Sequence, residues 1–370
     1  MQICHVTSVH TAKDDRIFYR ECISLLNAGY TVLEIAPNVP DEVYNGIRIY
    51  GVQVPKNKWK RSFFGKKAIY NKCVELDADV YHFHDPELVP VGVKLKKKHN
   101  KCVVFDSHED VPAQILTKEW LPAFLRKPIS KLYAFYEKQM LRHYDALVSV
   151  TPIIIDRLKK INVNTFQITN FPFIENYSID TREWDDSICF AGTISSERLH
   201  HNILKALQDV PNVKYRLAGW GADTYFAELK KYSAWQKVEY VGCIPFTDVN
   251  KFISKSSIGI VINDYYANVG YKQGTLGIIK FFEFMQMGLP VICTDFILWK
   301  EIIDEWKCGI CVNPHDIDAI RNAIVYLIEN KDIAKQMGDN GRRAVMEKYN
   351  WNTQEKILLE MYKKLEEKCK

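Results

Sequence analysis

The sequence predicts an α/β protein of two domains, each a parallel β-sheet with helices on both faces. Three observations support this fold class. At 370 residues the chain is too long for one ordinary core and about right for two domains. In both halves, short apolar strands alternate with helical segments, a pattern typical of parallel sheets. Between the halves, residues 171–186 lose this periodicity and contain proline and acidic residues, which predicts an interdomain linker.

Residues 1–170 are expected to form the first domain. Its opening elements are a strand at 2–9, a helix at 18–28 that ends before Gly29, and a strand at 30–36. Further strands are expected at 80–84, 102–106 and 146–150. Ligands of such sheets bind beyond the carboxyl ends of the strands. Polar residues stand at four of these ends, at 8–10, 84–85, 106–110 and 151, which indicates a binding site there.

Residues 187–348 are expected to form the second domain on the same plan. Its strands are expected at 188–191, 213–218, 238–241, 258–262, 291–294 and 310–312. The last segment, 349–370, contains an amphipathic helix, because apolar residues recur there at helical spacing: Ile357, Leu358, Met361, Tyr362 and Leu365.

Composition limits the possible classes of protein. A hydrophobic content of 47% excludes a disordered chain, and no apolar run is long enough to predict a membrane span. The chain enters a strand at once, without a basic and apolar leader, so we expect a cytoplasmic protein. The ten scattered cysteines predict reduced thiols. Cys308 and Cys311 form a CxxC that fits a turn and strand better than a redox or zinc pair.

Basic charge is concentrated in the first half. Residues 1–170 hold 25 Lys and Arg against 18 Asp and Glu, whereas residues 171–370 hold 25 against 27. The loop from Lys56 to Lys67 interleaves six basic side chains with three aromatic ones. Such a loop suits an anionic membrane surface, and a plain solvated loop is the alternative. No nucleic-acid-binding module is recognisable, so no nucleic acid partner is expected.

Residues 273–301 contain the strongest site motif. Two glycines frame the turn Gly274-Thr275-Leu276-Gly277, and a helix is expected at 278–287, before Gly288 and a strand at 291–294. A glycine turn that opens a helix exposes backbone N–H groups to an anionic phosphate. Two side chains of this helix suit a nucleotide: Lys280 for the phosphate and Glu283 for two ribose hydroxyls. The alternative is an ordinary helix–strand unit with a surface lysine and glutamate.

The segment KFFEFMQMGLPVICTD, with WKEII after it, resembles the donor-binding segment of family-four retaining glycosyltransferases of the GT-B fold, of the capsule and cell-surface polysaccharide type. The resemblance covers nearly the whole chain. It implies two Rossmann-like domains facing each other across a cleft, the first for the acceptor and the second for a nucleotide-sugar donor. It also implies that the final helix packs back on the first domain. Glu283 matches the family's ribose-binding glutamate, but Thr275 stands where many members carry a second glutamate.

The resemblance further implies donor contacts in the second domain. In the family, a glycine turn and two basic residues bind the leaving diphosphate. Here Gly192 matches the turn, Thr193 replaces the first basic residue, and Arg198 can serve as the second. Lys280 is expected to supply the missing charge. The loop of Cys243 and Ile244 matches the one against which the base packs, and an ordinary strand end is the alternative for it. The expected donor-binding set is Glu283, Gly274, Thr275, Leu276, Gly277, Gly192, Cys243 and Ile244.

Residues 5–32, beginning HVTSVHTAKDDRIFYREC, resemble the opening strand, loop and helix of the same family. The expected acceptor-binding set is His10, Asp15, Arg16, His84, Asp85 and Glu109. For residues 14–16 the alternative is that they cap the next helix. His108 matches the histidine that touches the donor sugar, so the expected catalytic set is His108, Arg198 and Lys280. His82 and His84 alternate along a strand, and we expect one to face each side of the sheet.

A metal site at His82, His84, Asp85 and His108 is the alternative for these side chains, but the resemblance implies that no metal is used. The motif G-x-S-x-G of a hydrolytic triad is absent. We therefore expect a retaining glycosyltransferase of the hexosyltransferase type, without a cofactor. It would move a sugar from a nucleotide diphosphate sugar, expected to be a UDP-sugar, to a lipid-linked glycan at the inner membrane face. A nucleotide-sugar epimerase or hydrolase and a non-catalytic GT-B partner subunit are the alternatives.

Overall fold

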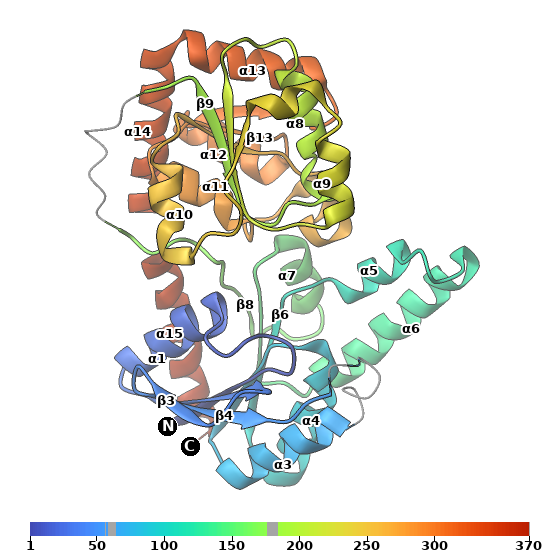
Figure 1. Cartoon of the computed structure of the whole chain (residues 1–370). Coiled ribbons are helices and arrows are strands. Elements are labelled where there is room, and N and C mark those ends of the chain that lie inside the picture. The colour runs from blue at the N-terminus through green and yellow to red at the C-terminus, as the bar shows by residue number, and fades with distance from the viewer. Residues whose placement is uncertain (56, 58–63, 176–183, 370) are drawn as a thin grey trace. The chain divides into compact units, whose positions relative to one another are not determined.

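The computed structural model describes residues 1–55, 57, 64–175 and 184–369. The chain divides into two compact units, residues 1–169 with 352–370, and residues 170–351 (Figure 1). Each unit contains one largely parallel sheet with helices packed against it, so the predicted fold class of two α/β domains is confirmed. Of the expected linker 171–186, residues 176–183 lie outside the described residues.

The first unit has an eight-stranded sheet in the order β3-β4-β2-β1-β5-β6-β7-β8. All neighbouring strands are parallel except β3 and β4. Strand order reverses beside β1, which pairs with β2 on one side and β5 on the other. Ligands of doubly wound sheets bind at such a reversal. The strands are β1 Gln2–Val6, β2 Thr31–Pro37, β3 Glu42–Tyr44, β4 Ile47–Val52, β5 Val80–Phe83, β6 Cys102–Ser107, β7 Ala146–Ser149 and β8 Thr165–Gln167.

The helix expected at 18–28 is instead a π-helix, η1 (Asp15–Cys22), continued by α1 (Ile23–Asn27). Asp14 caps it by accepting hydrogen bonds from the backbone of Arg16 and Ile17. Because a π-helix bonds residues five apart, Arg16 lies over Glu21 with Nε 3.2 Å from Oε1. The other helical segments of this unit are α3 Lys66–Leu76, η3 Pro86–Leu88, α4 Val89–His99, α5 Val111–Thr117, α6 Ala123–Leu141, α7 Pro152–Lys159 and α15 Trp351–Cys369.

The second unit has a six-stranded parallel sheet in the order β11-β10-β9-β12-β13-β14. Its strand order reverses between β9 and β12. The strands are β9 Ser187–Ala191, β10 Lys214–Ala218, β11 Val238–Tyr240, β12 Ile258–Val261, β13 Val291–Thr294 and β14 Gly309–Val312. The helical segments are η4 Ser196–Arg198, α8 His200–Leu207, α9 Asp223–Leu229, η5 Ser233–Lys237, α10 Phe246–Ile253, η6 Ala267–Val269, η7 Tyr271–Gln273, α11 Ile279–Gln286, α12 Ile297–Trp306, α13 Ile317–Glu329 and α14 Lys331–Glu347.

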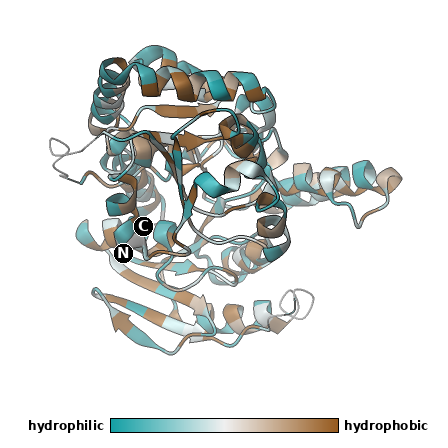
Figure 2. Ribbon diagram, turned by 45° about the horizontal axis from the view of Figure 1, so that its top comes forward, coloured by the Kyte–Doolittle hydropathy of each residue, from teal (hydrophilic) through white to brown (hydrophobic). Residues whose placement is uncertain are grey.

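Each sheet carries its own hydrophobic core. Figure 2 shows hydrophobic segments along the strands and hydrophilic segments on the outer helices. Among the residues that the structure describes, eight cysteines are free thiols. Cys102 is disulfide-bonded, so the prediction of reduced thiols is wrong at that position. In the part of the chain that the structure describes, no helix has the length and apolarity needed to cross a membrane.

Candidate functional site

The turn before α11 is closely packed at Gly274 and held by hydrogen bonds of Thr275. Gly274 has φ +82°, and a Cβ there would lie 2.5 Å from Cβ of Phe296, so a larger residue is excluded. Thr275 is buried. Its hydroxyl accepts a hydrogen bond from Gly277 N at 3.0 Å, and its carbonyl accepts one from Trp299 Nε1 at 2.9 Å. In place of the family's second glutamate, this threonine holds the turn together, and Leu276 packs against the core.

Lys280 and Glu283 form an ion pair on α11, with Nζ 2.6 Å from Oε2. Glu283 is almost wholly buried and Lys280 largely so. A Cβ on Gly192 would lie 3.5 Å from Cε of Lys280, so the lysine side chain runs beside the turn that follows β9. The structure thus brings two predicted donor-binding residues, Gly192 and Glu283, together with the predicted catalytic Lys280 at the reversal of strand order.

The loops after β9, β10 and β11 also meet at this edge of the sheet. Gly192 N donates to the Ala218 carbonyl at 3.0 Å, and Gly219 N donates to the Gly242 carbonyl at 2.8 Å. A Cβ on Gly219 would lie 1.8 Å from the carbonyl oxygen of Gly192, so only glycine permits this approach. The Gly219 contact carries the loop of Cys243 and Ile244 to the same rim, where Cys243 is exposed and Ile244 half-buried.

Arg198 is the second cation at this rim. Its guanidinium carbon lies 5.5 Å from the centre of the Phe190 ring, and burial lowers the pKa of its side chain. Its Nη1 is buried and has no hydrogen-bond partner among the described residues. A buried donor without a partner is costly, and an anionic ligand such as phosphate would satisfy it.

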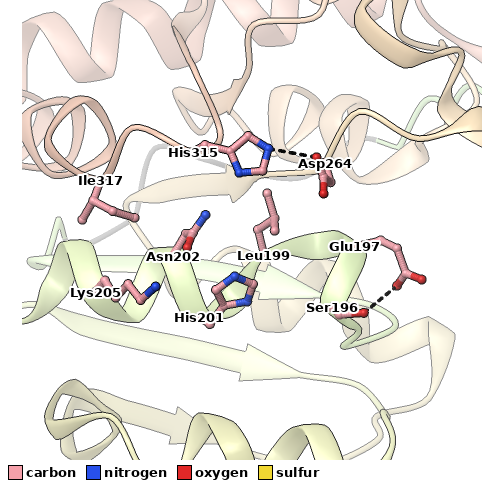
Figure 3. Close-up of a pocket in the computed structure, with 9 residues that line it drawn as sticks. All are labelled: Ser196, Glu197, Leu199, His201, Asn202, Lys205, Asp264, His315 and Ile317. Carbon is pink, nitrogen blue, oxygen red and sulfur yellow. Dashed lines mark hydrogen bonds and ion pairs between the residues drawn. The ribbon is translucent and has the colours of Figure 1, made fainter.

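A pocket of about 450 Å³ adjoins Arg198 in the same unit (Figure 3). His315 and Asp264 close one side through a contact of 2.9 Å, and Lys205 and His201 project from α8 on the other. These residues could not be recognised from the sequence, because their spacing in the chain forms no motif. The lining residues are Ser196, Glu197, Leu199, His201, Asn202, Lys205, Asp264, His315 and Ile317.

In the first unit, His10 lies between two carboxylates, 3.6 Å from Asp14 and 3.6 Å from Asp85. Burial by itself would lower the pKa of His10, but Asp14 and Asp85 raise it above its ordinary value. The His10 and His108 rings are 4.9 Å apart. Asp85 in turn accepts hydrogen bonds from Thr7 Oγ1 at 2.9 Å and Ser8 N at 2.6 Å. The loop after β1 is therefore fastened to the end of β5.

A buried layer lies beneath these histidines. Arg16 Nε donates to Asp106 Oδ2 at 2.6 Å, and His108 Nε2 lies 3.2 Å from the same oxygen. Burial would raise the pKa of Asp106, but Arg16 and His108 hold it well below the usual range. Arg16 and His84 are buried and in contact with Asp106, whereas Asp15 is partly exposed and pairs with Arg20. Glu109 is exposed.

The expectation that His82 and His84 face opposite sides of the sheet is wrong. Their rings are stacked with centres 4.7 Å apart, because residues two apart on a strand point to the same face.

Comparison with known proteins agrees with this division of the chain. Residues 16–169 match the family model "Glycosyltransferase Family 4", and residues 178–344 match "Glycosyl transferases group 1". Two uncharacterized glycosyltransferases of Methanocaldococcus jannaschii are related. MJ1069 is 28% identical over 48% of this chain and 45% of its own, and MJ1607 is 25% identical over 50% and 47%. The chain thus spans about half the length of these curated relatives.

Several solved structures have a similar fold over nearly the whole length of this chain. Sucrose-phosphate synthase from Thermosynechococcus elongatus has a TM-score of 0.76 at 18% identity, with 98% of each chain covered. Anabaena HepE, solved with UDP and glucose, has a TM-score of 0.71 at 13% identity, with 98% of this chain and 100% of its own covered. WaaG, a glycosyltransferase involved in lipopolysaccharide biosynthesis, has a TM-score of 0.71 at 14% identity, with 96% and 98% covered. The fold is GT-B, and the chain belongs to the glycosyltransferases of the group 1 and family 4 type.

Proposed function

We propose that this protein transfers a sugar from a UDP-sugar to a lipid-linked glycan, with retention of anomeric configuration, in the synthesis of a surface polysaccharide such as a capsule. The observation that carries the proposal is the arrangement of Lys280, Glu283 and Arg198 around the Gly192 turn. Two cations and a buried carboxylate at the reversal of strand order fit a nucleoside diphosphate.

The donor would use these groups in distinct ways. Lys280 and Arg198 would bind the diphosphate, and their charge would stabilise it as it departs. Glu283 would accept hydrogen bonds from the ribose hydroxyls, and the loop of Cys243 and Ile244 would pack against the base. UDP is favoured as the nucleotide because HepE was solved with it. No residue of the chain needs to form a lasting covalent bond to the sugar, since the leaving phosphate can take the acceptor's proton.

We assign the acceptor to the first unit. His10 lies on the loop after β1, beside Asp85 and His108, at the reversal of strand order in that sheet. His10 and His108 would contact the acceptor hydroxyl and the sugar directly. Arg16 and His84 are buried beneath these side chains and would act as positioning residues, because both contact Asp106, which in turn contacts His108.

The lipid-linked acceptor requires contact with the inner face of the membrane. The loop expected to provide it, Lys56 to Lys67, lies for the most part outside the described residues. A second surface on α5 and α6 supports the same partner. Phe124, Leu132 and Phe135 are exposed on α6, and Trp120 is exposed in the connection that precedes it. Basic side chains accompany them in the same segment: Lys118, Lys127 and Lys131. Aromatic and basic residues together suit an anionic bilayer surface.

A thermal-shift screen followed by product analysis tests the function. Purified protein is incubated with UDP-, GDP-, ADP- and CMP-sugars, and a bound donor should raise the melting temperature. The stabilising sugar nucleotide is then supplied with lipid-linked acceptors. Transfer to the lipid supports the proposal. Release or rearrangement of the sugar without an acceptor indicates a hydrolase or epimerase, and absence of any donor binding indicates a non-catalytic subunit.

A further inference from the structure

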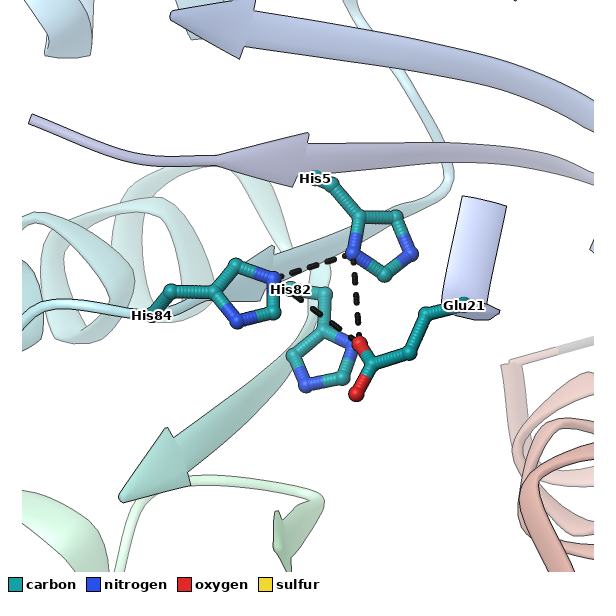
Figure 4. Close-up of side chains that lie close together, drawn as sticks. All are labelled: His5, Glu21, His82 and His84. Atoms are coloured by element: carbon teal, nitrogen blue, oxygen red, sulfur yellow. Dashed lines mark hydrogen bonds and ion pairs between the residues drawn. The ribbon is translucent and has the colours of Figure 1, made fainter. Parts of the chain in front are cut away.

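Three histidines and one glutamate meet in the interior of the first unit (Figure 4). His5 belongs to β1 and is the register partner of His82 on β5. His84 follows at the end of β5, and Glu21 reaches the same point from η1. All four side chains are buried, with exposed fractions of at most 1%. The transfer reaction proposed above uses none of these four side chains to contact a substrate.

Four atoms of this cluster are arranged as the ligands of one small cation would be. His5 Nδ1 lies 3.0 Å from His84 Nε2 and 3.7 Å from Glu21 Oε2. Glu21 Oε2 lies 3.7 Å from His82 Nδ1 and 4.0 Å from His84 Nε2. Ligands about 2.0–2.2 Å from a tetrahedral ion are separated by roughly 3.3–3.6 Å. These four separations bracket that value, and all four atoms lie within 4.8 Å of one another, so side-chain shifts of about 1 Å or less would close the shell.

The buried carboxyl of Glu21 is a second observation that fits a cation, although it also neighbours the Asp106 carboxyl. Within the described part of the chain, neither oxygen of Glu21 accepts a hydrogen bond, although Arg16 Nε lies 3.2 Å from Oε1. A buried carboxylate is normally hydrogen-bonded or bound to a metal. Three imidazole rings beside it supply nitrogen ligands, which are the preferred partners of zinc together with a carboxylate.

We propose that His5 Nδ1, His82 Nδ1, His84 Nε2 and Glu21 Oε2 bind one zinc ion. Two outer contacts would support it. His84 Nδ1 lies 3.5 Å from Asp106 Oδ2, as in sites where a carboxylate orients a ligating histidine. Arg16 faces Oε1 of Glu21, which leaves Oε2 for the ion. Two hydrogen bonds oppose it, and zinc would displace both: the Tyr362 hydroxyl lies 2.9 Å from His82 Nδ1, and His5 Nδ1 lies 3.0 Å from His84 Nε2.

The site would be structural. Four protein ligands complete a zinc shell and leave no open position for substrate. The ion would join β1, β5 and η1. His10 and Asp85 lie just after β1 and β5, and Arg16 lies within η1. The ion would therefore fix the acceptor side without entering the transfer step, and the proposal does not depend on that activity.

Metal analysis of the full-length protein tests this proposal. Protein purified without a metal-affinity tag, exposed to equimolar zinc and dialysed, should retain about one zinc per chain. Cobalt in place of zinc should give the strong visible absorption of a tetrahedral site. Glu21→Gln and His84→Ala should lose at least tenfold in affinity, whereas His143→Ala, outside the cluster, should not. Tyr362→Phe should bind at least as tightly, because it removes the competing hydroxyl.

Two results would overturn the proposal. One is wild-type protein that retains no zinc and shows no zinc-dependent rise in melting temperature. The other is retention of zinc by Glu21→Gln to the wild-type level, which would place the ion elsewhere. If Glu21→Gln does not fold, the wild-type stoichiometry and the cobalt spectrum with Tyr362→Phe decide the question.

Discussion

Replacing Glu283 by glutamine is the sharpest perturbation of the donor site. The change keeps the size of a nearly fully buried side chain and removes its charge. A hydrogen bond to a charged group contributes about 1.5–3 kcal/mol, so Glu283→Gln should weaken UDP binding roughly 10- to 150-fold. Isothermal titration calorimetry with UDP and UMP measures this. If Glu283 binds the ribose, both nucleotides should lose affinity by a similar factor.

The Lys280 ion pair supplies the matched control. Lys280→Met removes the partner 2.6 Å from Glu283 and the proposed diphosphate contact, so UDP should lose more affinity than UMP. Thermal unfolding of each variant checks that the helix α11 remains folded. A folded Glu283→Gln protein that binds UDP as tightly as the wild type would refute the ribose assignment.

Four further predictions follow from the structure. Arg198→Met should lower kcat more than it raises KM in steady-state assays, because its charge acts on the departing diphosphate; a change in KM alone would show uniform binding only. Brief EDTA treatment should leave the transfer rate unchanged, since no metal is proposed at the donor and the proposed zinc is buried; loss of activity that Mn²⁺ or Mg²⁺ restores would contradict this. Burial, with Arg198 and His201, lowers the pKa of His200 to about 3, below an unfolded value of about 6.5. As the pH falls, the unfolded state therefore takes up this proton before the folded state does. The contribution of His200 to the free energy of unfolding is fully present above about pH 6.5 and falls by about 1.4 kcal/mol per pH unit as the pH drops toward 3. In urea unfolding, the free energy of unfolding should fall less between pH 7 and pH 5 for His200→Gln than for the wild type. An equal fall in both proteins would refute this role of His200. Finally, the triple variant Trp120→Ala/Phe124→Ala/Phe135→Ala should lose binding to anionic liposomes in co-sedimentation. Val163→Ala, which changes an even more exposed apolar side chain, should not.

The strands of both sheets were largely predictable because each is a short apolar run. The segment 291–294 was predicted with the bounds of β13. The hairpin of β3 and β4 was missed, although Asn45 and Gly46, both at positive φ, form the dipeptide that favours a two-residue hairpin turn. The π-helix at η1 could not be predicted, since its register depends on contacts of Arg16 and Glu21 that the local sequence does not encode.

For the functional residues too, local motifs were predictable from the sequence and groupings that depend on the fold were not. The helix containing Lys280 and Glu283 was recognisable because its motif is local. The grouping of His5, Glu21 and His84 depends on strand register and on the π-helical turn, so residues far apart in the chain meet only after folding. The pocket beside Arg198 is also assembled from distant segments, 196–205, 264 and 315–317.

Hydrogen–deuterium exchange with and without saturating UDP-glucose tests most directly where the donor binds. If the donor binds as proposed, exchange should slow in residues 274–286, which contain the glycine turn and α11, and in the turn at 192–198. Residues 313–317, on the far wall of the pocket, should exchange at an unchanged rate. Protection confined to the pocket wall or to residues 1–169, with 274–286 unaffected, would contradict the proposed donor site.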